Sequence, residues 1–358
     1  MSTSGTSQPS VAAPETRPRP STVQEHLAGT SESWHGKVSS KTGPYQPRAA
    51  RYHLYVGLFC PFAHRVNIVR HLKGLTEVID VSIVRAYPKG DAKGWPGWRF
   101  PKDEAEYPGS TVDKVFGSEY LHQVYFRADP DYKGRYSVPV LWDTETGTMV
   151  NNESLELMRD LQTSFDEILP PSYAQVTLYP EALRDRIDQV AAWVQRHLNT
   201  GVYKAGFAES QEAYDENILP VFAALNRLEK MIHDNGGPYI LGQALTEVDV
   251  MVYATVIRFD VVYVQHFKVN LGTIRHDYPQ LNNWLKNLFW NVKGFRETTD
   301  FKHIKENYTK SHGDINPRAI TPPGPWPDIE SGYESNLQQV RIGGVLMPEV
   351  VELEASLA

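Results

Sequence analysis

Cysteine is the scarcest residue in this 358-residue chain and occurs once, at Cys60. A single cysteine excludes a disulfide framework and is typical of proteins that work in a reducing compartment such as the cytoplasm. A C-x-x-C redox motif is excluded as well, because Ala63 stands where the second cysteine would be. Any thiol–disulfide chemistry at Cys60 must therefore use a resolving thiol from outside the chain.

The chain also lacks long apolar runs and an excess of positive charge. No uninterrupted apolar stretch approaches membrane-spanning length, and the first residues have no apolar core of the signal-peptide type. The net charge of −7 argues against nucleic acid or an anionic membrane as the main partner. A hydrophobic content of 41% with 22% charged residues indicates a globular protein long enough for two domains. We therefore expect a cytoplasmic protein whose partners are small molecules.

The residues around Cys60 predict a strand that leads directly into a helix. Residues 53–59 are apolar, β-branched and aromatic, which is typical of a short buried strand. Pro61 suits the first position of a helix, and near-helical spacing continues to a glycine stop at Gly74. At such a helix start, the helix dipole and unpaired backbone N–H groups favour a thiolate over a thiol.

The position of Cys60 at a helix start therefore favours a reactive thiol over the alternative of an inert buried cysteine, which is common in intracellular proteins. His64 and Arg65 follow one turn later and should add positive potential. A zinc site built on Cys60 and His64 would have too few ligands. We therefore expect no metal.

Upstream of about residue 170, the patterns predict an α+β domain that follows a tail. Residues 1–45 are rich in Ser, Thr, Pro and Gly and predict a flexible tail. Within residues 46–170, a second strand over 78–84 completes a βαβ unit with the strand and helix around Cys60. A long connection follows, with a short helix expected over 114–125.

The same domain is expected to end with a strand pair and a helix. A proline in the strand over 137–143 requires a sheet edge, a bulge or a cis bond at Pro139. A turn over 144–147 leads to the return strand, after which an asparagine should cap a helix over 155–161.

Downstream, residues 171–315 predict an all-helical domain, and residues 316–358 predict an extended segment with a possible short strand over 340–345. Pro220 should kink or delay one of the helices, and Thr246 with Asp249 resembles a capping box. The helical patterns cover residues 182–199, 210–234, 246–260, 278–290 and 295–304.

Taken in order, these motifs resemble the glutathione transferase superfamily, and more narrowly its xi class, the S-glutathionyl-hydroquinone reductases, with an omega-like cysteine. Cys-Pro-Phe-Ala-His-Arg at 60–65 is similar to the family's C-P-W-A-H-R, with Phe62 in place of tryptophan. The resemblance runs from about residue 50 to 330. The other matching stretches are 97–100, 128–135, 138–143, 152–154, 201–208, 258–260, 262–267, 303–308, 311–312 and 316–317.

This resemblance implies a thioredoxin-like domain with a mixed sheet and helices, then the all-α domain of a glutathione transferase, in a homodimer. It implies Cys60 as the nucleophile. For glutathione it implies the backbone of Val138 beside a cis proline, the start of a helix at Glu153 and Ser154, and a cover by Trp98. The alternatives are a structural turn at Val138, ordinary capping at Glu153 and core packing for Trp98.

Three tyrosines, Tyr203, Tyr263 and Tyr308, match family tyrosines that line the pocket for the second substrate. A phenol can donate a hydrogen bond to a quinol oxygen, and an aromatic wall suits a flat ring. With 19 tyrosines in the chain, packing is the alternative for each. Arg127 and Arg135 are further candidates for a glutathione carboxylate, and the sequence does not decide between them.

The implied function is reductive removal of glutathione from S-glutathionyl-hydroquinones through a Cys60–glutathione mixed disulfide, with glutathione as co-substrate. The main alternative is an omega-like thiol transferase or dehydroascorbate reductase, which would share the cysteine and the fold. A conjugating transferase would need a hydroxyl rather than a thiol at this position. A ligand-binding module with a vestigial site would tolerate the same residues.

Overall fold

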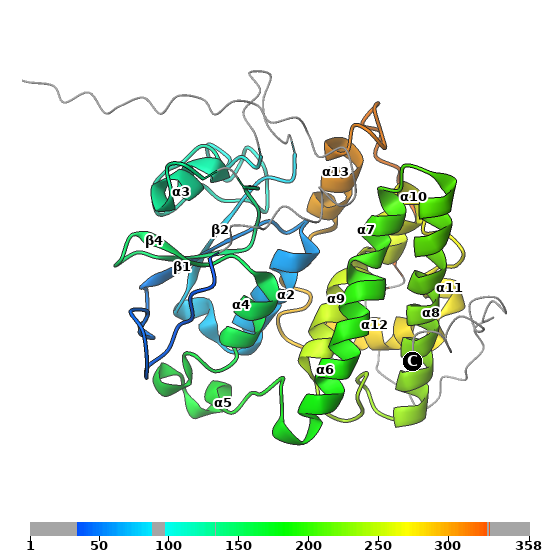
Figure 1. The fold of residues 1–358 in the computed structure, drawn as a ribbon, viewed down its shortest axis with the longest axis horizontal. Helices are drawn as coiled ribbons and strands as arrows, with labels where there is room; N and C mark the ends of the chain where they lie inside the picture. The colour runs from blue at the N-terminus through cyan, green and yellow to red at the C-terminus, as the bar shows by residue number, and fades with distance from the viewer. Residues whose placement is uncertain (1–33, 88–96, 133, 328, 330–358) are drawn as a thin grey trace, which may run out of the picture.

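The computed structural model describes residues 34–87, 97–132, 134–327 and 329. It has a domain built on one sheet and, beside it, a domain of helices (Figure 1). The strand expected over 340–345 lies outside the described residues. None of the described helices is long and apolar enough to cross a membrane.

A four-stranded mixed sheet forms the first domain, with the strand order β2-β1-β3-β4. The first pair is parallel and joined through helix α2 (Pro61–Leu72), so the predicted βαβ unit is confirmed. The other two pairs are antiparallel, which gives the mixed sheet that the sequence predicted. The strands are β1 (Tyr52–Val56), β2 (Asp80–Ile83), β3 (Val140–Asp143) and β4 (Thr148–Asn151).

The proline beside the third strand takes one of the three forms that the sequence left open. The Val138–Pro139 peptide bond is cis, and β3 begins at the following residue, Val140. The proline thus lies just outside the hydrogen-bonded ladder, where its missing N–H leaves no strand partner unsatisfied. The turn between β3 and β4 contains Gly147 with a φ of 68°, a left-handed conformation that favours glycine.

Two helices of this domain begin at residues other than those predicted. The helix expected over 114–125 begins later, after Tyr120, because the side chain of Gln123 accepts the Tyr120 N–H at 3.0 Å and caps that position. The cap of the last helix is Glu153 rather than an asparagine. Described elements between strands and after β4 are η1 (Leu75–Glu77), α3 (Leu121–Ala128), α4 (Ser154–Asp160), η2 (Asp166–Ile168) and α5 (Pro171–Ala174).

The second domain is helical, as predicted, and contains more elements than the periodicity indicated. Helix α8 (Gln211–Asn235) runs through Pro220, so the prediction of a delayed start is wrong. The capping box of α9 (Glu247–Arg258) is confirmed, since Asp249 accepts the Thr246 N–H at 2.9 Å. The others are η3 (Glu181–Leu183), α6 (Arg184–Trp193), η4 (Val194–Asn199), α7 (Gly201–Gly206), η5 (Phe259–Tyr263), α10 (Val264–His266), α11 (Ile274–Asp277), α12 (Pro279–Asn291) and α13 (Phe301–Ser311).

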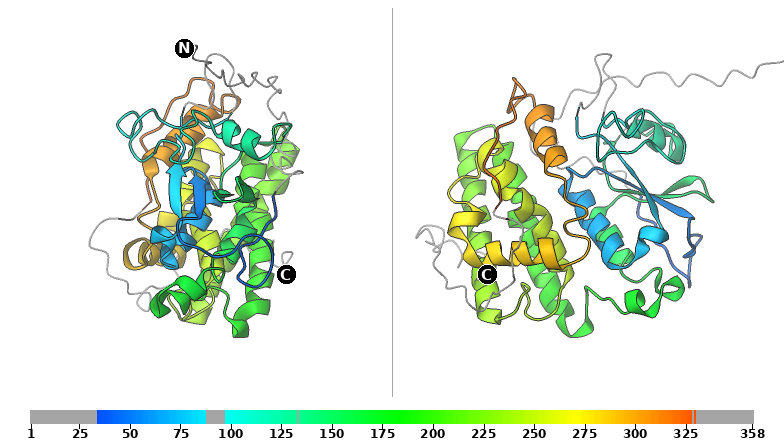
Figure 2. Two further views of the ribbon diagram at one scale, coloured as in Figure 1. Left: turned by 90° about the vertical axis from the view of Figure 1, so that its left-hand side faces the viewer. Right: turned by 180° about the vertical axis from the view of Figure 1, so that it is seen from behind.

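Helix α13 lies between the sheet domain and the other helices, as the views in Figures 1 and 2 agree. It begins later than the predicted helix over 295–304, because Asp300 accepts the His303 N–H at 2.8 Å and caps the helix there. Asn307 donates to the Ala86 carbonyl at 3.1 Å, which ties α13 to the loop after β2.

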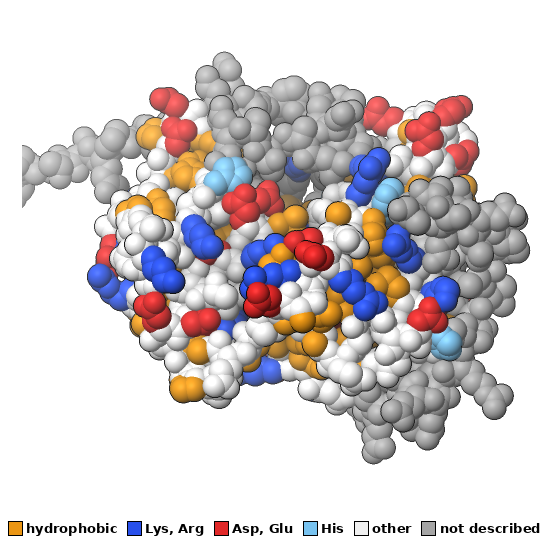
Figure 3. All heavy atoms as spheres, turned by 60° about the horizontal axis from the view of Figure 1, so that its bottom comes forward, with side chains coloured by type: hydrophobic (Ala, Val, Ile, Leu, Met, Phe, Trp, Pro, Cys, Tyr) orange, Lys and Arg blue, Asp and Glu red, His pale blue; other side chains and the backbone are white. Residues whose placement is uncertain are grey.

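Both ends of the described chain pack against the body. Residues 34–45, expected in the flexible tail, lie against the first domain: Val38 is fully buried, and its N–H donates to Asp160 at 3.0 Å. At the other end, the Lys305 ammonium donates to the Pro323 carbonyl at 2.7 Å, so part of the extended segment lies over α13. On the face seen in Figure 3, basic and acidic side chains are interspersed rather than gathered by sign.

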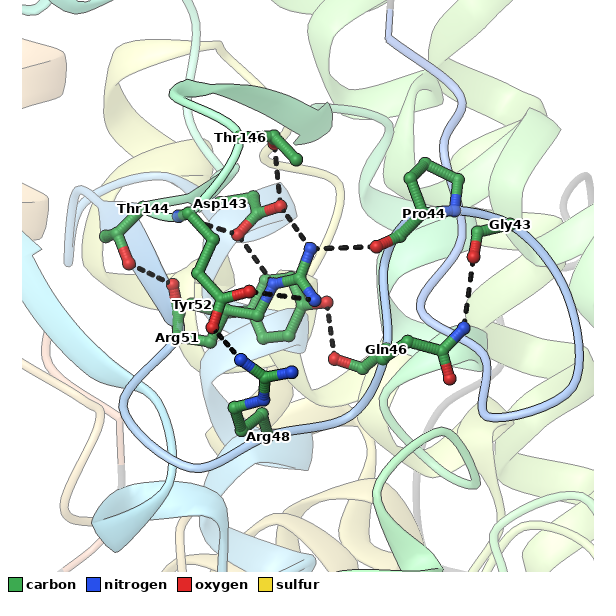
Figure 4. A network of polar contacts seen from close by, with 10 residues as sticks. Gly43, Pro44, Gln46, Arg48, Arg51, Tyr52, Asp143, Thr144 and Thr146 are labelled. Carbon is green, nitrogen blue, oxygen red and sulfur yellow. Dashed lines mark hydrogen bonds and ion pairs between the residues drawn. The ribbon is translucent and has the colours of Figure 1, made fainter.

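A buried ion pair joins the start of β1 to the end of β3 (Figure 4). Arg51 donates two parallel hydrogen bonds to Asp143, at 2.8 and 2.7 Å, and the two side chains are 4% and 0% exposed. Burial raises the pKa of the Asp143 carboxyl, but the hydrogen bonds from Arg51 and Thr146 outweigh it and lower the pKa below its usual range.

Replacing Asp143 with asparagine should lower the free energy of unfolding by about 3–5 kcal/mol at pH 7, because the buried Arg51 charge loses its two-bond partner and keeps only the partly exposed Glu145 carboxylate, at 3.3 Å. As the carboxyl has a lowered pKa in the folded state, its contribution is present above the unfolded pKa of about 3.9 and is lost as the pH falls further. Denaturant unfolding should therefore show a difference in unfolding free energy between variant and wild type that becomes smaller below about pH 4.

The matched control is Arg48→Met, which removes an ion pair between Arg48 and Glu145 whose side chains are 62% and 41% exposed. An exposed pair contributes at most about 1 kcal/mol. Equal losses in the two variants would contradict a special role for the buried pair.

Candidate active site

Cys60 lies at the N-cap of α2, half-buried, between the end of the β1 loop and the cis-proline turn. Its N–H donates to the Gly57 carbonyl at 2.9 Å, which fixes the residue in an extended conformation at the helix start. Its thiol donates to the Val138 carbonyl at 3.6 Å. The structure therefore brings together two of the predicted site residues, Cys60 and Val138, from positions far apart in the chain.

The helix start acts on the Cys60 thiol in the predicted direction, and burial acts against it. Burial raises the pKa of the Cys60 thiol, and this is the largest influence on it. The N–H groups of Ala63 and Phe62 and the guanidinium groups of Arg258 and Arg65 lower the pKa, as expected for a helix start with cations nearby, but together they offset only part of the rise.

His64 does not supply the positive potential that the sequence predicted. Burial and the neighbouring Arg258 hold its pKa well below its usual range, so the ring is neutral. Because Arg258 can only donate, the His64 Nδ1 accepts its Nη1 hydrogen bond at 2.9 Å. The proton is therefore on Nε2, which donates to the Thr298 hydroxyl at 2.8 Å.

The positive charge beside Cys60 comes from two buried arginines. Arg65, which the sequence predicted, is 1% exposed, donates to Gln195 at 3.3 Å and lies over the Phe62 ring at 4.9 Å. Burial lowers its pKa to about 10, so it stays charged at neutral pH. Arg258 comes from α9 and is fully buried. Arg258 lies in one of the stretches that match the family, but the sequence alone indicates no role for it.

The other residues predicted to bind glutathione, Trp98, Glu153 and Ser154, are half-buried or buried in the first domain. Trp98 is half-buried, and its ring lies 4.3 Å from that of Phe59, the residue before Cys60. Glu153 caps α4, accepting the Leu155 N–H at 3.4 Å, and Ser154 is the buried first residue of that helix. The Arg65 charge interacts with both Cys60 and Glu153, which places the α4 start near the thiol.

Arg135 is better placed than Arg127 to meet a ligand near Cys60. Its half-buried guanidinium interacts with the Cys60 charge and makes no hydrogen bond or ion pair to other residues within the described chain. Arg127 instead lies over the Phe116 ring at 4.2 Å. The sequence named both arginines and could not choose, because side-chain pairing is decided by tertiary packing.

The three predicted tyrosines come together on the helical side of the site and form a tyrosine cluster of Tyr203, Tyr263 and Tyr308. They come from α7, η5 and α13 and are all buried. The Tyr308 hydroxyl is hydrogen-bonded to the Tyr203 hydroxyl and, at 3.1 Å, to the Tyr263 hydroxyl. Burial raises the pKa of all three phenols, so they are protonated at neutral pH and can donate.

Aromatic rings connect this cluster to the cysteine helix. Phe62, two residues after Cys60, lies 6.0 Å from the Tyr203 ring, and Tyr203 and Tyr263 lie close enough to Cys60 for a charge there to raise the pKa of both phenols. Phe207 and Phe267 pack against the other side of Tyr203, at 6.3 and 5.3 Å. Phe62 and Tyr203 thus join the cysteine helix to a set of aromatic side chains with linked hydroxyl groups, which we call the aromatic enclosure. Among the described residues, no group of three or more His, Cys, Asp or Glu could hold a metal ion.

Comparison with known proteins agrees with this architecture. Residues 59–164 match the glutathione S-transferase N-terminal domain, and residues 211–287 match the C-terminal domain. The crystal structure of glutathione transferase Xi 1 from Trametes versicolor is 45% identical, with a TM-score of 0.78 over 83% of this chain and 99% of that one. The chain belongs to the Xi class of the glutathione transferase superfamily. The fold and the family that the sequence predicted are thereby confirmed.

Several relatives of this Xi-class transferase carry one of two kinds of name. "Glutathione S-transferase omega-like 2" of Schizosaccharomyces pombe is 49% identical, over 83% of this chain and 93% of the relative. "Glutathionyl-hydroquinone reductase YqjG" of Escherichia coli is 42% identical, over 84% and 87%. A glutathione-bound structure of YqjG matches this chain with a TM-score of 0.77 at 40% identity, over 84% of this chain and 95% of that one.

Proposed function

We propose that this Xi-class transferase is a glutathione-dependent reductase that removes glutathione from S-glutathionyl-hydroquinones. The observation that carries the proposal is one thiol, Cys60, bonded to the Val138 carbonyl beside the cis proline, with the tyrosine cluster on the helical side of the site. The names of the YqjG relative and of "Glutathionyl-hydroquinone reductase PcpF" of Sphingobium chlorophenolicum, which is 42% identical over 78% of this chain and 85% of the relative, support it.

Glutathione would bind along the first domain. Its cysteinyl backbone would pair with Val138 as an added strand, and its γ-glutamyl carboxylate would meet Ser154 and the N–H groups at the start of α4. Glu153 would accept the glutamyl ammonium, Trp98 would cover the tripeptide, and the half-buried Arg135 would pair with a carboxylate.

The hydroquinone ring would lie in the aromatic enclosure of the helical domain. Its oxygens would accept hydrogen bonds from the tyrosine cluster, whose phenols stay protonated because burial raises their pKa. We thus propose glutathione binding by residues 46–170 and hydroquinone binding by residues 171–315, in a cytoplasmic homodimer as the family resemblance implies.

In the first step, the Cys60 thiolate attacks the glutathione sulfur of the conjugate. An S–S bond forms, the bond between sulfur and the ring carbon breaks, and that carbon keeps the electron pair and takes up a proton. Tyrosine hydroxyls bonded to the ring oxygens stabilise the charge that develops on the ring. The products are free hydroquinone and a Cys60–glutathione mixed disulfide.

In the second step, the thiolate of a second glutathione attacks the glutathione sulfur of the mixed disulfide. Oxidised glutathione leaves, and Cys60 is released as a thiolate. The second thiol must come from solution because the chain has no other cysteine. Over the cycle, two electrons from two glutathionyl groups reduce the ring carbon.

The omega-like name of some relatives makes a general thiol transferase or dehydroascorbate reductase the alternative. Such an enzyme would use the same cysteine and the same glutathione site. The aromatic enclosure favours the hydroquinone, because three linked hydroxyl groups beside Phe62 match a flat ring that carries oxygens.

Intact-mass measurement tests the proposal directly. Mixing the protein with a glutathionyl-hydroquinone and no free glutathione should add one glutathione to Cys60 and release one equivalent of unconjugated hydroquinone. An adduct formed only from oxidised glutathione would favour the thiol transferase instead. Binding of the conjugate without any adduct would overturn the enzymatic assignment.

A further inference from the structure

Arg258 reaches from the helical domain into the backbone that precedes the active-site cysteine. It is the last residue of α9 and is fully buried. Its guanidinium donates to the carbonyls of Phe59 at 3.0 Å and Leu58 at 2.9 Å. It also donates to the Ala254 carbonyl at 2.7 Å and to Nδ1 of the neutral His64 at 2.9 Å.

All four of these acceptors are uncharged, and no ion pair joins Arg258 to a carboxylate within the described residues. A buried charge is costly unless an opposite charge compensates it. The groups nearby that can become negative are Cys60 and the phenols of Tyr253, Tyr263 and Tyr308. A thiol ionises more readily than a phenol, so Cys60 is the group that this cation favours as an anion.

We propose that Arg258 is a positioning residue for Cys60: it holds the Leu58–Phe59 backbone so that the sulfur stays at the helix start, and it supplies the buried counter-charge of the thiolate. This inference deepens the proposed function. In that cycle Cys60 is the nucleophile of the first step and the leaving group of the second, and a fixed positive charge favours the thiolate in both.

Other charged or titratable groups also face Cys60 and differ from Arg258 in what they contact. Arg65 on α2 and Arg135 in the first domain are cations on the same domain as the thiol, and neither bonds the backbone before Cys60. Tyr203 and Tyr263 face it from the helical domain as neutral phenols.

Arg258 also couples the two halves of the site. Helix α9 continues directly into η5, which carries Tyr263. One continuous helical stretch therefore holds the loop before Cys60 at one residue and a hydroxyl of the tyrosine cluster five residues later. A shift of this stretch would move the sulfur and the tyrosine cluster together.

The test measures how alkylation of Cys60 by iodoacetamide depends on pH, followed by intact mass. The single cysteine makes the label specific. The midpoint is the pH at which alkylation reaches half of its maximum rate. Arg258→Met should raise this midpoint by about one pH unit or more and slow alkylation at pH 7 about tenfold. Arg258→Lys, which keeps the charge, should recover most of the shift. Arg258→Gln keeps hydrogen-bond donors without charge and should behave like the methionine variant.

The matched control is Arg159→Met. Arg159 also joins the two domains, from α4 to Glu247 on α9, and its half-exposed side chain is not among the groups that shift Cys60. Its variant should keep the wild-type midpoint. Circular dichroism and thermal unfolding of every variant separate lost charge from lost folding.

Equal midpoints for wild type and the methionine or glutamine variants would overturn the inference and leave Arg258 a structural role. If the methionine variant does not fold, glutamine against lysine decides, and equal midpoints there would again overturn it. Alkylation needs no substrate, so a shifted midpoint without hydroquinone turnover would leave the inference standing while the proposed function fails.

Discussion

Cys60→Ser should abolish release of hydroquinone from a glutathionyl-hydroquinone, with a loss of at least about a thousandfold in kcat/KM. Serine keeps the size and place of the side chain, but its hydroxyl is a far weaker acid and cannot form the mixed disulfide. Chromatography of the released hydroquinone measures the loss, and intact mass should detect no glutathione adduct.

This variant should still fold and bind glutathione, because the Cys60 side chain donates only one long hydrogen bond among the described residues, at 3.6 Å, to the Val138 carbonyl. Its thermal midpoint and its affinity for glutathione are the controls. Turnover retained near the wild-type rate would refute Cys60 as the nucleophile and point to direct attack by a bound glutathione.

Tyr308→Phe should lower kcat for hydroquinone release about a hundredfold, the scale seen when one preorganised donor to a developing charge is removed. The Tyr308 hydroxyl is bonded to those of both Tyr203 and Tyr263, so its loss breaks the linked set at its middle. The negative charge that develops on the ring as the bond between sulfur and the ring carbon breaks would then be less stabilised. Single-turnover measurement of hydroquinone release isolates this step.

Tyr52→Phe is the matched control, since Tyr52 is also buried and loses one hydroxyl bond, at 2.8 Å, to the Gln46 carbonyl away from the site (Figure 4). It should lose stability without losing turnover. In Tyr308→Phe the alkylation of Cys60 should stay near wild type. Equal rates of hydroquinone release in the two variants would remove the tyrosine cluster from the mechanism.

Residue periodicity and the positions of proline and glycine predicted most of the fold, because both act on neighbouring residues. Apolar runs and helical spacing indicate which segments are buried, and Pro61 and Gly74 mark the two ends of the cysteine helix. The sequence did not predict a helix start that depends on a side chain capping an earlier residue, as the Gln123 side chain caps the Tyr120 N–H. Pro220 did not delay its helix, which packing holds on both sides of the proline.

The sequence likewise predicted some residues of the candidate site and not others. The motif around Cys60 and the matching tyrosine contexts named residues that the structure brings together, although the chain itself gives no distance between Tyr203 and Tyr308. Arg258 was not assigned a role, because its acceptors beside Cys60 lie about 200 residues earlier and only domain packing brings them within reach.

The sequence by itself determined that this protein has one thiol, at a helix start, so that a thiol–disulfide cycle at Cys60 would need a second thiol from solution. Those facts follow from residue identity and local spacing. Only the tertiary structure decided the charge around the thiol. Burial raises the pKa of Cys60 and keeps His64 neutral, and domain packing brings Arg258 beside the thiol as a cation that His64 does not supply. Desolvation and long-range charge depend on what packs around a group, which local sequence does not specify.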